Sequence, residues 1–323
     1  MKSVLIFIAV VCSVSALPSG RINEGTLAEP GNYPYVVSIT ENDRHICGGF
    51  IYSARWIVTA ASCVEGKTPS TLRVVAGQVS AINLDPNEQT VSVYTVTIFP
   101  QYDSDLKLND IALLKLTADI NMDGENVDFV GYNEAVNGVD AEIMGWGATF
   151  EGGFESVNLR YATAFINVKG AGDLCGTFDT TAFNFATMIC ASTVADPPPA
   201  RAVGSPCKYD EGSPLVQKLG TDSVATVVGI LSKSDDCSLD TAVSVYTRVS
   251  IFYSWLINTA GQQPVRTTTL HPQQQLSTPM VKNKTVHRDF YAKPSLSRCL
   301  SIPLANSIYD VVGKHILDMN KHV

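Results

Sequence analysis

The stretch CGGFIYSARWIVTAASC, residues 47 to 63, predicts the fold class of this chain. It contains two short apolar runs, Phe50-Ile51 and Trp56-Ile57-Val58, made of β-branched and aromatic residues. Runs of this length and composition favour strands. Similar runs recur between residues 33 and 265, for example at Val224 to Leu231, and Gly, Pro, Asn and Asp separate them. This pattern is typical of an all-β domain with many turns.

The all-β pattern ends in one short helix and a polar extension. From Ile251 to Ile257 the apolar side chains recur at the spacing of one helical face, and Gly261 follows. Residues 262–278 are rich in Thr, Gln and Pro, which is the composition of a linker. We therefore expect residues 262–323 to be a linker and a basic tail that is disordered or weakly helical.

Charge divides the chain into two units of different character. The formal net charge is -8, which argues against nucleic acid and anionic membranes as partners. Residues 22–263 hold 13 Lys and Arg against 28 Asp and Glu, whereas residues 264–323 hold 8 basic against 3 acidic residues. This asymmetry indicates an acidic body and a basic tail, two units of different physical character.

The N-terminus has the pattern of a secretory signal. Lys2 precedes an apolar run from Val4 to Cys12, and small residues at 14–16 provide a cleavage point. The run is too short to span a bilayer. We predict a signal peptide at 1–16, a short propeptide at 17–21 and secretion to the extracellular space.

Cysteine usage agrees with an oxidising compartment. Seven cysteines follow Cys12, and six of them lie where they can pair within the body. Cys299, in the tail, is left as a free thiol or an intermolecular bridge.

Several segments together resemble the trypsin/chymotrypsin-like serine protease family (peptidase S1). The resemblance covers residues 22–261, and the segments keep the family's order along the chain. They are Arg21-Ile22-Asn23-Glu24-Gly25, Tyr33 to Ile39, Cys47 to Ile51, Trp56 to Cys63, Asn109 to Leu114, Met144-Gly145-Trp146-Gly147, Cys207 to Leu215 and Val245 to Val249.

The resemblance implies two six-stranded antiparallel β-barrels with a short C-terminal helix and a site in the crevice between them. It also implies three disulfides: Cys47-Cys63, Cys175-Cys190 and Cys207-Cys237.

The hydrolytic machinery of that family is incomplete here. It combines an attacking serine, a histidine that accepts its proton and an aspartate that orients the histidine. By resemblance these positions hold Glu211, Ser62 and Asp110, so only the aspartate is retained. A serine hydroxyl is no general base near neutral pH, and the attacking hydroxyl is absent.

The oxyanion hole is also altered. Tyr209 stands where the family has a glycine that supplies a backbone N–H group, and tyrosine tolerates positive φ poorly. Glu211 adds a carboxylate where negative charge must develop in the transition state. We predict no intact catalytic site.

Substitute chemistry has little support in the sequence. His45 is the one histidine between residues 22 and 261, and we expect it to make a structural hydrogen bond near the nucleophile loop. Ser213 is a displaced nucleophile without a base. Asp110 and Glu211 form a carboxylate pair of the kind that hydrolyses glycosides, but a relic and a replacement explain them more simply. No His/Cys cluster has metal-ligand spacing, so we predict no metal and no cofactor.

Activation and specificity features are retained in part. Cleavage after Arg21 would free the amine of Ile22, which in the family pairs with the aspartate at the Asp210 position. By resemblance the specificity pocket is lined by Ser205, Ser232, Lys233, Ser234 and Ser244.

The sequence thus predicts a secreted serine protease homologue without a working triad, a zymogen-like pseudoenzyme. It would bind protein or peptide ligands, such as active proteases or protease inhibitors, as a decoy, cofactor or regulator. The alternatives are a serine endopeptidase with displaced or residual chemistry and a non-functional relic. Asn283 begins an N-glycosylation motif in the tail.

Overall fold

The computed structural model describes residues 25–83, 85–136, 139–167, 183–193, 204–219, 224–234, 237 and 243–264. All of them lie in one compact unit that ends at Arg266. The predicted signal peptide and propeptide, and the tail beyond residue 264 with Asn283 and Cys299, lie outside the described residues.

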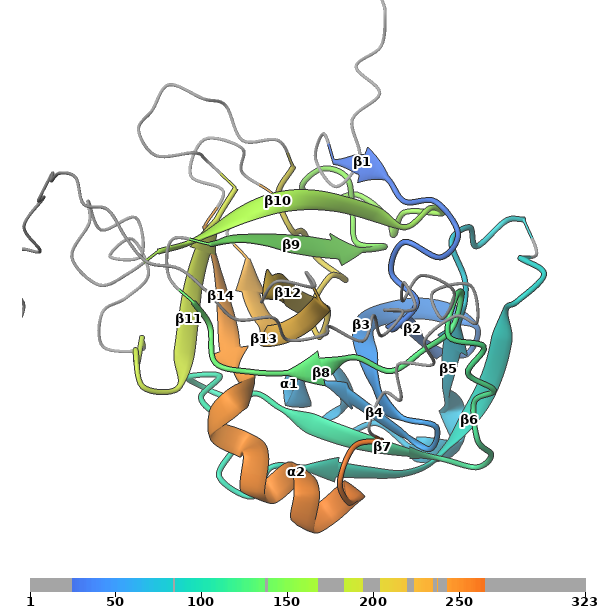
Figure 1. Ribbon diagram of the computed structural model, residues 1–323, viewed down its shortest axis with the longest axis horizontal. Coiled ribbons are helices and arrows are strands. Elements are labelled where there is room, and N and C mark those ends of the chain that lie inside the picture. The colour runs from blue at the N-terminus through green and yellow to red at the C-terminus, as the bar shows by residue number, and fades with distance from the viewer. Residues whose placement is uncertain are drawn as a thin grey trace, which may run out of the picture. The chain divides into compact units, whose positions relative to one another are not determined.

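The first half of the chain forms a closed barrel of six antiparallel strands (Figure 1). The strand order around it is β2-β3-β4-β7-β6-β5. Their bounds are β2 Val36–Glu41, β3 Arg44–Ser53, β4 Trp56–Thr59, β5 Leu72–Ala76, β6 Gln89–Ile98 and β7 Ala112–Leu116. Phe50, Ile57 and Leu114 are fully buried in the core, so the apolar runs that predicted strands are the strands that form the core.

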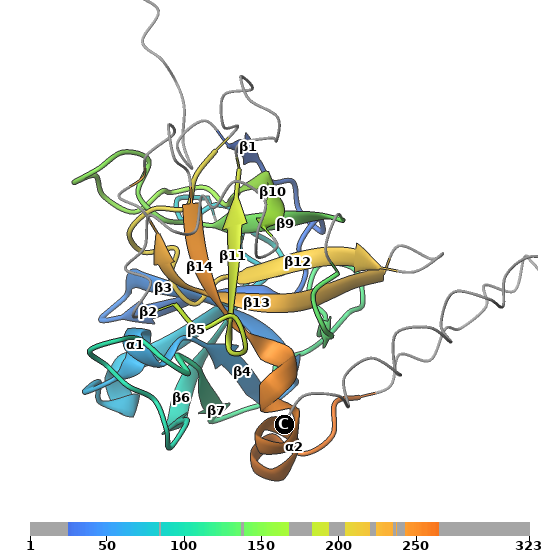
Figure 2. The ribbon, with the colours of Figure 1, turned by 90° about the vertical axis from the view of Figure 1, so that its left-hand side faces the viewer.

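The second half forms another ring of six antiparallel strands, β9-β10-β11-β14-β13-β12, which closes because β9 pairs with both β10 and β12. The members are β9 Asp140–Gly145, β10 Arg160–Asn167, β11 Met188–Ser192, β12 Pro214–Leu219, β13 Val224–Ser234 and β14 Val243–Arg248. β12 and β13 run side by side as an antiparallel pair (Figure 2). The predicted pair of six-stranded barrels is therefore confirmed.

Two short strands extend the second ring in a way that the sequence did not predict. β1, Thr26–Leu27, adds antiparallel to β10, and β8, Gly131–Tyr132, adds parallel to β13. Each has two residues, too few for a hydrophobic period to be read.

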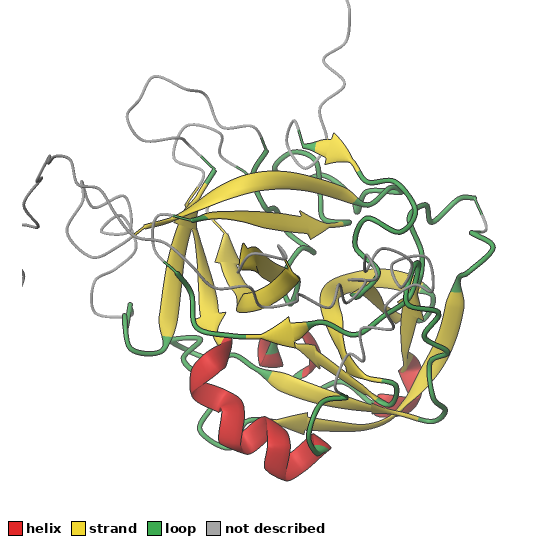
Figure 3. Ribbon diagram, in the orientation of Figure 1, coloured by secondary structure: helices red, strands yellow, loops and turns green. Residues whose placement is uncertain are grey.

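The helices among the described residues are short (Figure 3). They are α1 Ala61–Val64, η1 Pro69–Thr71, η3 Val249–Phe252 and α2 Tyr253–Ala260. The predicted C-terminal helix is confirmed, with a 3-10 turn before it and Gly261 at φ 83° after it. Phe252 and Leu256 are buried, whereas Tyr253 is exposed. No helix among the described residues is long and apolar enough to cross a membrane.

Disulfides join segments that lie close together in the fold. Cys47 and Cys63 are bonded, as are Cys207 and Cys237, which agrees with the pairing that the family resemblance implies. Cys190 is also disulfide-bonded, and Cys175, its predicted partner, lies outside the described residues.

Candidate functional site

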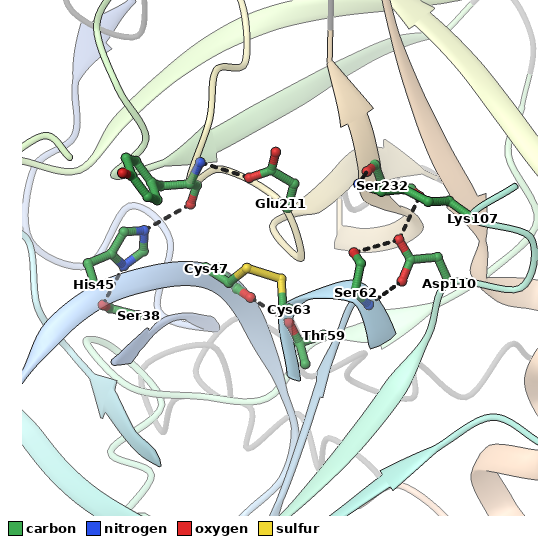
Figure 4. Close-up of a disulfide and its surroundings, with 12 residues drawn as sticks. Ser38, His45, Cys47, Thr59, Ser62, Cys63, Lys107, Asp110, Glu211 and Ser232 are labelled. Carbon is green, nitrogen blue, oxygen red and sulfur yellow. Dashed lines mark hydrogen bonds between the residues drawn. A yellow bond between two sulfur atoms is a disulfide. The ribbon is translucent and has the colours of Figure 1, made fainter. Parts of the chain in front are cut away.

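Asp110 is the centre of a hydrogen-bond network that joins the two barrels. It lies just before β7 and is fully buried. Its Oδ1 accepts a hydrogen bond from the backbone N–H of Ser62 at 2.7 Å, and its Oδ2 accepts from Ser62 Oγ at 2.8 Å (Figure 4). Ser232, from β13, donates its Oγ–H to the same Oδ2 at 2.6 Å. The carboxylate is thus held by donors alone, and none of them accepts a proton readily near neutral pH.

Glu211 folds back onto its own loop. Its Oε2 accepts the backbone N–H of Tyr209 at 2.7 Å (Figure 4). Burial raises the pKa of Glu211, while its own backbone N–H, that of Tyr209 and the ammonium of Lys107 act in the opposite direction. The backbone N–H of Tyr209, a donor that an anion could use, is therefore occupied by the protein's own carboxylate.

Tyr209 adopts the left-handed backbone conformation, with φ 79°, although it is not glycine. Its carbonyl accepts a hydrogen bond from His45 Nε2 at 2.9 Å, and His45 Nδ1 lies 2.7 Å from Ser38 Oγ. Because a carbonyl only accepts, Nε2 carries the proton and Nδ1 accepts from Ser38. Burial lowers the pKa of His45 to about 4, so the ring is neutral at physiological pH and has a structural role.

Asp210 is buried in the interior. Its carboxylate accepts the N–H of Gly147 at 2.7 Å and that of Cys207 at 3.0 Å. A Cβ added to Gly145 or Gly147 would lie 2.1 or 2.3 Å from the Asp210 carboxylate, so glycine is required at both positions. Burial raises the pKa of Asp210 to about 7. Within the described part of the chain no basic side chain forms an ion pair with it, and its predicted partner Ile22 lies outside that part, as does Arg21.

Ser213 is buried in the interior. It is 3% exposed, and its Oγ has no hydrogen-bond partner in the described structure. A Cβ added to Gly48 would lie 1.9 Å from this Oγ. Ser213 and Asp210 line a cavity of about 10 Å³, the size of one water. This location argues against Ser213 as a displaced nucleophile.

The five predicted pocket residues come from β13, β14 and the loop before Cys207. Ser205, Ser232 and Ser244 are buried, and Ser234 is paired with Ser244 across the two strands. Lys233 directs its ammonium to the carbonyl of Leu106 at 2.9 Å. Lys233 thus contacts the loop that contains Leu106.

Lys107 is a site residue that the sequence did not reveal. Its Nζ donates to the carbonyl of Ser232 at 3.1 Å, from a loop that approaches β13 only in the tertiary structure. A single lysine three residues before Asp110 carries no pattern that would have identified it. Among the described residues there is no group of three or more His, Cys, Asp or Glu that could hold a metal ion.

Comparison with known proteins adds a further finding. The family model described as trypsin matches residues 22–256. Trypsin alpha of Drosophila melanogaster is 29% identical over 272 residues, which are 81% of this chain and 99% of that protein. Hypodermin-B of Hypoderma lineatum is 32% identical and covers 79% of this chain and 98% of its own length. Serine protease 56 of Mus musculus is 30% identical over 73% of this chain and 38% of its own length.

Proposed function

We propose that this chain, which belongs to the trypsin family, acts by binding other proteins and does not hydrolyse peptide bonds. The observation that carries the proposal is the pair of hydroxyls, from Ser62 and Ser232, that hydrogen-bond Asp110. In the family the aspartate orients an imidazole, and the imidazole takes the proton of the nucleophile. With a hydroxyl at Ser62, the site has no group that can do so.

His45, the one histidine between residues 22 and 261, does not replace the catalytic histidine of the family. His45 is held between Ser38 and the Tyr209 carbonyl, and burial keeps its pKa near 4. The carboxylate of Glu211 supplies no hydroxyl and already accepts the N–H of Tyr209, where a transition-state oxyanion would need a donor. These contacts support a loss of hydrolysis at three separate steps: attack, proton transfer and charge stabilisation.

The alternative is an endopeptidase with displaced chemistry. Similarity to trypsin alpha of Drosophila melanogaster favours it, since that protein is 29% identical over 99% of its length. The buried Ser213 speaks against it, because a nucleophile must reach the substrate.

Secretion, cleavage after Arg21 and pairing of Ile22 with Asp210 belong to the same proposal. The disulfides fit an oxidising, extracellular compartment. Partners of the proposed type are active proteases or their inhibitors, for which a folded but non-hydrolysing homologue is a decoy or cofactor. Affinity capture from the native secretion, with the intact chain as bait, would identify them.

Covalent labelling with a fluorophosphonate tests the proposal. The chain cut after Arg21 should remain unlabelled and should cleave ester substrates at least about 10⁴-fold more slowly than an active trypsin. The variant carrying Ser62→His, Glu211→Ser and Tyr209→Gly serves as a control, since it returns the base, the nucleophile and the glycine. Labelling of the unaltered chain at a serine, abolished when that serine is replaced by alanine, would overturn the proposal.

A further inference from the structure

We propose that the crevice at Asp110 is closed from within, by Lys107 and Glu211, against extended peptide chains. This inference goes beyond the proposed function and does not depend on the loss of hydrolysis, because an inhibitor loop binds whether or not a bond is cut. It assigns to two side chains the role of an internal plug, so that partners of the proposed type would bind without inserting an extended loop at this place.

The end of β13 provides an open strand edge. β12 pairs with β13 from Val224 to Ile230, while β14 pairs with it as far as Ser234. Among the described residues no strand therefore pairs with the β12 side of β13 beyond Leu231. An edge of this kind is where an extended peptide adds as a further strand, through main-chain hydrogen bonds.

The loop of residues 103–108 covers that edge. Lys107 donates its ammonium to the Ser232 carbonyl, and Lys233 donates to the Leu106 carbonyl in the opposite direction. An incoming peptide N–H would need the Ser232 carbonyl as acceptor, but the ammonium already uses it. Lys107 thus takes the place of the missing strand at this position.

The loop is held in place by its own contacts. Asp103 accepts the N–H groups of Asp105 and Leu106 through Oδ1, each at 3.0 Å, and its backbone N–H donates to the Leu108 carbonyl. Lys107 has φ 53°, a conformation that is uncommon for a residue with a side chain. The loop therefore presents Lys107 in one defined, strained geometry, which is typical of functional positions.

Glu211 closes the donor side of the same crevice. A peptide carbonyl at this place would need the Tyr209 N–H, which the Glu211 carboxylate already accepts at 2.7 Å. Burial raises the pKa of Glu211, and the ammonium of Lys107 acts in the opposite direction. One acceptor and one donor of the crevice are thus both satisfied within the chain.

The plug is tested by measuring the binding of a Kunitz-type inhibitor that carries leucine at the position whose side chain enters the specificity pocket. We expect the unaltered full-length chain to bind it with a Kd at least tenfold weaker than the Lys107→Ala, Glu211→Ala double variant. Glu211→Gln, whose amide oxygen can still accept the Tyr209 N–H, should give a smaller gain than Glu211→Ala. The matched control is Lys218→Ala with Glu125→Ala, which removes the same charges from exposed positions elsewhere and should leave the Kd unchanged.

Three outcomes would overturn the inference. The first is inhibitor binding by the unaltered chain that is as tight as binding by the double variant. The second is a double variant that shows the native circular dichroism spectrum and melting transition but no gain in binding. The third is a double variant that associates with itself and not with the inhibitor, since Lys107 would then only protect a strand edge from aggregation.

Discussion

At the scale of a single residue, Tyr209 holds a backbone conformation that suits glycine. Its φ of 79° lies in the left-handed region, where a Cβ meets the following carbonyl. Its side chain compensates in part, because it packs against Ala148 and the Cys207–Cys237 disulfide, and Lys208 lies 5.0 Å from the ring centroid. The backbone N–H of Tyr209 remains in the orientation that binds the Glu211 carboxylate.

Two substitutions at Tyr209 separate the backbone strain from this packing. Both Tyr209→Ala and Tyr209→Gly lose the ring, but only alanine keeps a Cβ in the left-handed region. We expect the alanine variant to be less stable than the glycine variant by about 1–2 kcal/mol, measured by urea unfolding.

The same pair at Tyr94, an exposed residue of β6 with ordinary φ, should rank in the reverse order, by about 0.5–1 kcal/mol. Equal stabilities of the two Tyr209 variants would show that the loop relaxes when the ring is removed and that the native backbone is unstrained.

Gln217 shows, at the scale of an element, how a strand of the second barrel holds a connecting segment. It is a fully buried polar residue of β12. Its Oε1 accepts the N–H of Val136, and its Nε2 donates to the carbonyls of Val136 and Val139, each at 2.8 Å. One side chain thus satisfies three backbone groups of the segment that leads from β8 into β9.

Gln217→Leu should therefore cost about 3 kcal/mol of unfolding free energy, because buried N–H and C=O groups lose their partners. Gln89→Leu is the comparison, since Gln89 makes the same type of bonds to the backbone of Asn121 at an exposed site. There water can replace the amide, and the expected loss is below about 1 kcal/mol. If the two variants lost the same stability, the bonds of Gln217 would not be what holds the segment.

At the scale of the whole molecule, two buried groups set how stability varies with pH. The pKa of His45 is lowered to about 4 by burial, so the unfolded chain binds a proton first, and stability is lost as pH falls from about 6.5 towards 4. The pKa of Asp210 is raised to about 7 by burial, so the folded chain holds a proton that the unfolded chain releases. Stability from this carboxyl is greatest near pH 4 and is lost as pH rises through about 7.

Cleavage after Arg21 should change this balance, if the freed amine of Ile22 pairs with Asp210. A cation beside the carboxylate lowers its pKa, and each unit is worth about 1.4 kcal/mol of stability at pH 8. We expect a higher Tm at pH 8 after processing and almost no change at pH 4.5, as followed by thermal melts. Asp210→Asn, which cannot ionise, should remove the alkaline gain. A Tm that responds to cleavage equally in the asparagine variant would exclude the ion pair.

Much of the architecture was predictable from residues close together in the chain. The β-branched and aromatic runs at Phe50-Ile51 and Trp56-Ile57-Val58 lie in β3 and β4, because side chains of this kind pack on a pleated, buried surface. The order of the family motifs indicated which cysteines pair, and two of those pairs are present among the described residues. The family resemblance also implied that Asp110 and Ser62 share one site, and the two residues are hydrogen-bonded to each other.

Residue identity by itself determined which groups stand at two of the family's three catalytic positions, namely a hydroxyl at Ser62 and a carboxylate at Glu211. Only the tertiary structure decided which contacts the side chains of the site make. Glu211 lies on the Tyr209 N–H, Lys107 on the Ser232 carbonyl, and Ser213 in the interior. Lys107 and Ser232 are 125 residues apart in the sequence, so only the folded chain brings them together. Burial and loop geometry select the positions of Glu211 and Ser213, and no local sequence pattern records that choice.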